Sequence, residues 1–131
     1  MSLREQILKA DDHARSTVHV PRWGVTLTIK SWTGEDRWQW EQWCNEGKLP
    51  GQQPDSLETM CKAIVLAIVD EAGEPVFRRA DVAELKKRNA AELLRVFGAI
   101  GKLNSITEEE VGDLRKNLPQ EPLNGSCTLL P

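Results

Sequence analysis

The spacing of hydrophobic positions along this chain changes character near residue 17. From there, apolar and polar residues alternate through "TVHV" and then "VTLTIK", the two-residue period of a β-strand with one buried face. Pro21 in the intervening "PRWG" stops the first ladder, and Gly24 supplies the unusual backbone angles of a turn. We therefore predict a β-hairpin at about residues 17–31. Two strands alone are marginally stable in water, so the apolar side of the hairpin must lie against helices. That side consists of Val18, Val20, Val25, Leu27 and Ile29.

Elsewhere the apolar residues follow the helical period of 3.6 residues. Helix starts are marked where a Ser, Thr or Asp precedes an acidic residue by three positions, because the two side chains can cap the first turn. These pairs are Ser2 and Glu5, Thr33 and Asp36, Asp55 and Glu58, Asp81 and Glu84, and Thr107 and Glu110. We predict helices at about residues 2–10, 33–46, 55–70, 81–88, 89–104 and 107–118. The third is apolar on most of its circumference in its second half and should be the central, buried helix. The fifth carries Leu93, Val96, Phe97 and Ile100 at helical spacing.

These elements predict a mainly helical α+β fold, with about five to six helices and an N-terminal β-hairpin. A chain of 131 residues is most simply one domain. We place that domain at residues 1–118. The remaining residues 119–131, "PQEPLNGSCTLLP", are rich in proline and turn formers and have no period. We expect them to form a flexible C-terminal tail.

The stretch "RWQWEQW" places three of the five tryptophans within residues 37–43. At about 100° per residue, Trp40 and Trp43 lie about 60° apart on a helix, whereas Trp38 lies on nearly the opposite side. One helical face cannot bury all three. We predict that Trp40 and Trp43 are core residues, and that Trp38 either packs on another element or is left for a partner.

Composition narrows the classes of function. The net charge of -3 gives no general attraction for nucleic acid. The three cysteines, at positions 44, 61 and 127, are odd in number and far apart, which favours free thiols in a reducing cytoplasm over disulfides or a metal site. No apolar run has membrane-spanning length, and the start "MSLREQILKADD" lacks the features of a signal peptide. We expect no cofactor, no nucleic acid and no membrane among the partners.

Residues that could carry chemistry are few. His13 and His19 are the histidines available for acid–base work, and both are expected to be surface residues. A second hypothesis is a helix-turn-helix regulator that binds DNA through the basic residues of the helices between 78 and 95. Those residues are Arg78, Arg79, Lys86, Lys87, Arg88 and Arg95. The simpler interpretation is a solvated charged surface.

The order of several motifs resembles the tail assembly chaperones of long-tailed bacteriophages and prophages. The resemblance covers about residues 2–118, and its most specific parts are "VPRWG", "DEAGEPVF" and "LNSITEEEV". It implies a non-enzymatic helper in the host bacterial cytoplasm, absent from the finished virion. Such a protein binds the tape measure protein, keeps it soluble and helps recruit tail tube subunits, mainly through a longer form made by programmed ribosomal frameshifting. It also implies that several copies act together.

We take Trp38 and the "VFRRADVAEL" segment as candidate contacts with a protein client. The candidates, chosen from helical projection and exposed apolar character, are Trp38, Val76, Phe77, Val82 and Leu85. A DNA-binding regulator, or a structural tail or head component that stays in the virion, is the alternative. An enzyme ranks behind these because no nucleophile, acid pair or metal cluster has a useful spacing.

Overall fold

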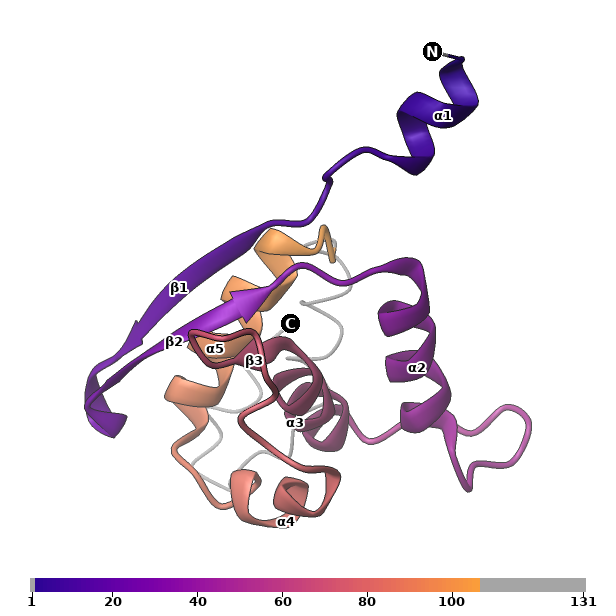
Figure 1. The fold of residues 1–131 in the computed structure, drawn as a ribbon. Helices are drawn as coiled ribbons and strands as arrows, with labels where there is room; N and C mark the ends of the chain where they lie inside the picture. The colour runs from indigo at the N-terminus through magenta and orange to yellow at the C-terminus, as the bar shows by residue number, and fades with distance from the viewer. Residues whose placement is uncertain (1, 107–131) are drawn as a thin grey trace, which may run out of the picture.

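The structure is a computed structural model that describes residues 2–106. This part of the chain has five α-helices and a three-stranded antiparallel sheet, which confirms the mainly helical α+β fold with an N-terminal hairpin (Figure 1). The predicted helix at 107–118 and the tail at 119–131 lie outside the described residues. The elements are α1 (Leu3–Leu8), β1 (Arg15–Val20), η1 (Pro21–Trp23), β2 (Val25–Lys30), α2 (Gly34–Asn45), α3 (Ser56–Ala67), β3 (Ile68–Val69), η2 (Arg79–Asp81), α4 (Val82–Leu85) and α5 (Ala90–Leu103).

The hairpin forms as predicted. Strands β1 and β2 pair from Arg15 opposite Lys30 to Val20 opposite Val25. The connection η1 is a 3₁₀ turn, and Gly24 ends it in the left-handed region at φ +68°, which a residue with a Cβ adopts at a steric cost. The expected inward side is only partly buried: Val20 is buried, but Val25 is 42% exposed because it lies at the tip of the ladder beside the turn.

Helix α5 holds the hairpin at both ends. At one end, Glu92 accepts a hydrogen bond from the Arg22 amide at 3.0 Å; at the other, Asn104 accepts one from the Trp32 amide at 2.6 Å. The amide group of Asn104 also donates to the Ile100 carbonyl at 3.2 Å. Between these two hydrogen-bonded ends, α5 buries its predicted apolar stripe against the hairpin and α3. The stripe is Leu93, Val96, Phe97 and Ile100, each at most 1% exposed.

The predicted third helix is too long. Helix α3 ends at Ala67, and Ile68–Val69 form β3, which pairs with Thr28 and Ile29 of β2. The reason is that a short, continuous apolar run has the same appearance in a buried helix and in a buried strand. Beyond β3 the chain turns back, so that Val69 also bridges to Pro75.

The predicted helix at 81–88 is also shorter, and a separate 3₁₀ turn, η2, precedes it. The Asp81 carboxylate accepts a hydrogen bond from the Arg78 amide at 2.8 Å, so it caps the turn η2 rather than pairing with Glu84. Only one turn of α-helix, α4, follows. Helix α2 behaves as expected, because Thr33 and Asp36 form a complete capping box at its start.

The tryptophans of α2 divide as the projection predicts. Trp40 is 5% exposed and donates a hydrogen bond from its indole nitrogen to the Thr59 carbonyl at 3.0 Å. Its ring also lies 5.2 Å from that of Trp32 and 6.5 Å from that of Phe97. Trp43 is 9% exposed. These two rings anchor α2 to the core, whereas Trp38 faces away from it.

The hydrogen bonds that Glu92 accepts make the stability of the fold depend on pH. The Arg22 amide, and then Arg95 at 3.1 Å, stabilise the charged carboxylate and lower the pKa of Glu92. A carboxyl group whose pKa is lower in the folded state stabilises the fold above its unfolded pKa, about 4.3, and loses that contribution as pH falls through the folded value. We expect Glu92→Gln to lower the free energy of unfolding at neutral pH and to flatten its decline in acid.

Urea unfolding at several pH values between 3 and 7 measures this effect. Glu46→Gln is the matched control, because Glu46 is exposed and its side chain makes no hydrogen bond or ion pair among residues 2–106. The expectation would be contradicted if the free energy of unfolding fell equally steeply with decreasing pH in Glu92→Gln and in the unmodified protein.

Candidate functional site

Among residues 2–106, the structure shows neither a metal-binding cluster nor a reactive thiol. Within residues 2–106, no group of three His, Cys, Asp or Glu side chains could hold a metal ion. Burial raises the pKa of Cys44, and it raises that of Cys61 to about 11, so neither thiol is a ready nucleophile. In the same part of the chain, no helix combines the length and apolar character needed to cross a membrane.

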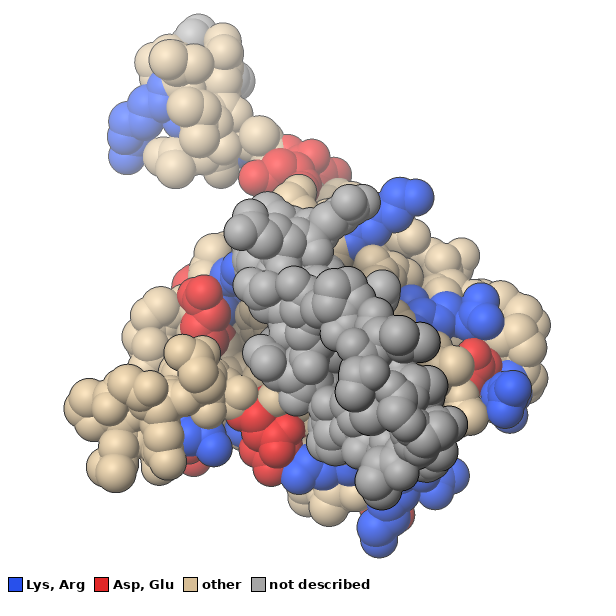
Figure 2. All heavy atoms as spheres, turned by 180° about the vertical axis from the view of Figure 1, so that it is seen from behind, with Lys and Arg blue, Asp and Glu red and all other residues tan. Residues whose placement is uncertain are grey.

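Four of the six basic residues proposed for DNA binding are already engaged by other side chains. Lys86 lies 2.7 Å from Glu58, and this contact lowers the pKa of Glu58 and raises that of Lys86. The Arg79 guanidinium stacks 4.4 Å from the ring centre of Trp43. On the face shown in Figure 2, Lys and Arg are interspersed with Asp and Glu. The first helix of the predicted pair, α4, has only four residues, which is short for the supporting helix of a helix-turn-helix. Two further residues of this basic group form ion pairs, Lys87 with Glu84 and Arg95 with Glu92.

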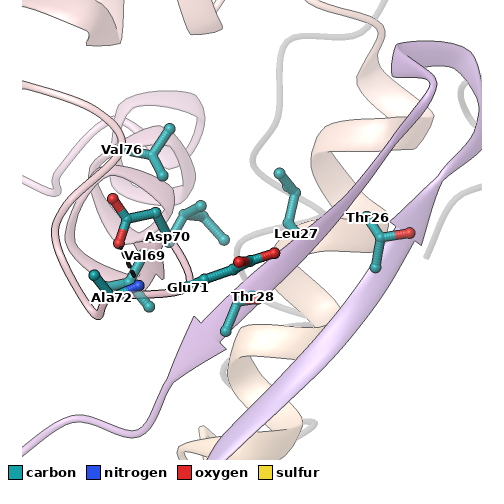
Figure 3. A pocket seen from close by; sticks show the side chains of 9 residues that line it. Thr26, Leu27, Thr28, Val69, Asp70, Glu71, Ala72 and Val76 are labelled. Atoms are coloured by element: carbon teal, nitrogen blue, oxygen red, sulfur yellow. Dashed lines mark hydrogen bonds between the residues drawn. The ribbon is translucent and has the colours of Figure 1, made fainter.

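The surface that stands out is apolar and centres on Val76, which is 49% exposed. Two open hollows meet at this residue. One lies along β2 (Figure 3), and the other lies beside α4. Val76 is the residue that the two hollows have in common, and we give the name Val76 strip to five of the larger apolar residues that line either of them: Leu27, Val69, Val76, Phe77 and Leu85. The charged residues around it are Asp70, Glu71, Asp81, Glu84 and Arg88.

The turn from Asp70 to Glu74 positions this strip. The Asp70 carboxylate accepts hydrogen bonds from the amides of Ala72 and Glu74, each at 2.9 Å. Gly73 has φ +87°, and a Cβ there would lie 2.7 Å from the Arg15 guanidinium. The same guanidinium donates to the Glu71 carbonyl at 3.4 Å. The "DEAG" sequence is therefore needed to fold the chain back along β3 and to present Val76 and Glu71 at the surface.

The predicted contact residues fall into two groups. Val76, Phe77 and Leu85 line the strip, although Leu85 is only 6% exposed and belongs to its floor. Val82 is half-buried beside them and packs on the core. Trp38 is 60% exposed on α2 and lines neither hollow.

Sequence reasoning missed the β2 side of this surface. The sequence pattern places Leu27 only on the inward side of the hairpin and Val69 only within the predicted helix at 55–70. It gives no role to Glu71. A signal was present, because a turn sequence placed directly after an apolar run can also end a strand. The pairing of that strand with β2, however, depends on contacts between distant parts of the chain.

Comparison with known proteins addresses the fold. No family model matches the sequence, and no curated protein matches it. Among solved structures, the chain is similar to the tail assembly chaperone of bacteriophage HK97, with a TM-score of 0.50. The chain has the fold of a phage tail assembly chaperone. The alignment covers 76% of this chain and 91% of the HK97 chain at 18% sequence identity, so the likeness concerns the fold alone.

The division of the tryptophans leads to a mutational prediction. Trp43→Ala removes a buried ring that stacks on Arg79 and should lower the free energy of unfolding by about 3–5 kcal/mol. Trp38→Ala removes an exposed ring and should change it by about 0.5 kcal/mol or less. Denaturant titration of both variants provides the measurement, and equally large losses would contradict the division.

Proposed function

We propose that this chain is a tail assembly chaperone of a long-tailed bacteriophage or prophage. It binds the tape measure protein in the host bacterial cytoplasm, keeps it soluble and helps recruit tail tube subunits, the last mainly through a frameshifted longer form. It is not an enzyme and leaves the assembly before the virion is complete. The observation that carries this proposal is the fold shared with the HK97 chaperone over 91% of that protein.

The exposed apolar residues support a role in binding protein. Val76, Trp38 and Leu49 are 49%, 60% and 71% exposed, and they lie on separate parts of the surface rather than in one deep pocket. Weak apolar contacts spread over a surface suit a long client that must be held soluble and then released. The carboxylates around the Val76 strip favour client segments in which an apolar stripe is flanked by Lys or Arg.

Co-expression with the tape measure protein encoded nearby tests the proposal. We expect the chain to raise the soluble fraction of that protein and to co-purify with it. Val76→Asp should weaken the complex at least about tenfold, because a charge in the apolar strip must be desolvated when the client binds. Gln53→Asp, at an exposed position that lines neither hollow, should leave the complex intact.

Three outcomes bear on the proposal in different ways. A tape measure protein that is equally soluble without the chain, and that forms no complex with it, would show that the chaperone role is wrong. If the strip variant and its control co-purified equally well with the tape measure protein, the chaperone role would stand but the contact would lie elsewhere. Presence of the chain in purified virions would indicate a structural component instead.

A further inference from the structure

Helix α1 is an arm without a partner. It extends away from the rest of the molecule (Figure 1), and none of its residues is buried. Leu3, Ile7 and Leu8 are 72%, 63% and 67% exposed. Ser2 caps the helix by accepting a hydrogen bond from the Glu5 amide at 3.2 Å. A six-residue helix with one cap is unstable alone in water, so this arm needs a surface on which to fold.

The arm presents one distinctive face. At about 100° per residue, its three exposed apolar residues fall within an arc of about 140°, and Arg4 projects between Ile7 and Leu8. Glu5, Gln6 and Lys9 point the other way. The Arg4 guanidinium makes no hydrogen bond or ion pair with any described residue. A surface that covers this face must therefore be apolar and must carry a carboxylate.

The Val76 strip meets both requirements. Most carboxylates around it already have partners: Asp70 bonds turn amides, Asp81 bonds the Arg78 amide and Glu84 pairs with Lys87. The Glu71 carboxylate, in contrast, has no hydrogen bond or ion pair within the described part of the chain. Figure 3 shows its side chain extending from the turn toward Leu27 of β2. An unpaired acid thus lines the same hollow as the half-exposed Val76.

We propose that the α1 arm of one copy docks on the Val76 strip of a second copy, with Arg4 paired to Glu71. A second copy fits better than the arm's own chain because of how the arm leaves β1. Ala14 pairs with Ser31, whose amide donates to the Ala14 carbonyl at 2.9 Å and whose hydroxyl accepts from the Ala14 amide at 2.8 Å. This pairing continues the hairpin ladder and directs the arm away from the body. Each copy then has one arm and one strip, so docking forms a pair or a longer series of copies.

Sedimentation equilibrium of the purified full-length protein, over a wide concentration range and at low salt, tests this proposal without any client. The average mass should rise with concentration. Arg4→Glu and Glu71→Arg should each weaken self-association about tenfold or more, because each places like charges against one another in a partly desolvated contact. The double variant, which exchanges the two charges, should recover to within about threefold of the unmodified protein.

Matched controls keep the result specific. Lys9→Glu repeats the charge change of Arg4→Glu on the other face of the arm, and Glu46→Arg repeats that of Glu71→Arg at the end of α2, away from the strip. Both should leave the mass distribution unchanged. A monomeric mass at every concentration would overturn the proposal. So would a double variant that self-associates no more strongly than the two single variants. Since no client takes part, these outcomes are independent of whether the tape measure protein binds.

Discussion

Two backbone amides of the β-hairpin, those of Arg22 and Trp32, bond to side chains at opposite ends of α5, and the rest of the architecture depends on these contacts. They fix the direction in which β1 and β2 cross the helix, so that Val20 and Ile29 meet the apolar stripe of α5. The position of β2 then decides where β3 can pair. The turn after β3 follows, and it presents Val76 and Glu71. The candidate surface is therefore set by contacts that lie well outside it.

A second set of contacts, around Trp43, fixes α2 to this core. Two cations contact the indole ring, with the Lys62 ammonium 5.3 Å and the Arg79 guanidinium 4.4 Å from its centre. Lys62 also donates a hydrogen bond to the Trp43 carbonyl at 3.1 Å. Because these cations come from α3 and η2, one ring joins three segments of the chain. This explains why a basic segment that could be interpreted as a nucleic-acid surface has a structural role here.

Local chemistry in the sequence is sufficient to predict much of the fold. The capping box at Thr33, the glycine at position 24 and the spacing of the α5 stripe each specify a structure that needs no distant partner. The same holds for the separation of Trp38 from Trp40 and Trp43. Prediction is wrong where a segment is decided by its surroundings. The run ending at Val69 is equally compatible with helix and strand until β2 lies beside it.

The candidate surface was predictable only in part for the same reason. Val76 and Phe77 could be selected because they are apolar residues in a charged segment. Their neighbours Leu27 and Glu71 could not, since nothing local indicates that β2 and the turn after β3 border one hollow. The floor position of Leu85 likewise depends on how α4 packs against α3.

The bridge between Val69 and Pro75 also has a consequence for solubility. Exposed sheet edges are templates on which other extended chains can add, and a protein with the proposed chaperone role would meet many such chains. Proline has no amide hydrogen, so the segment that covers the outer edge of β3 cannot continue the ladder at that position. At this position a further strand finds no amide donor. A partner that binds there depends more on side-chain contacts, whose chemistry can discriminate between partners.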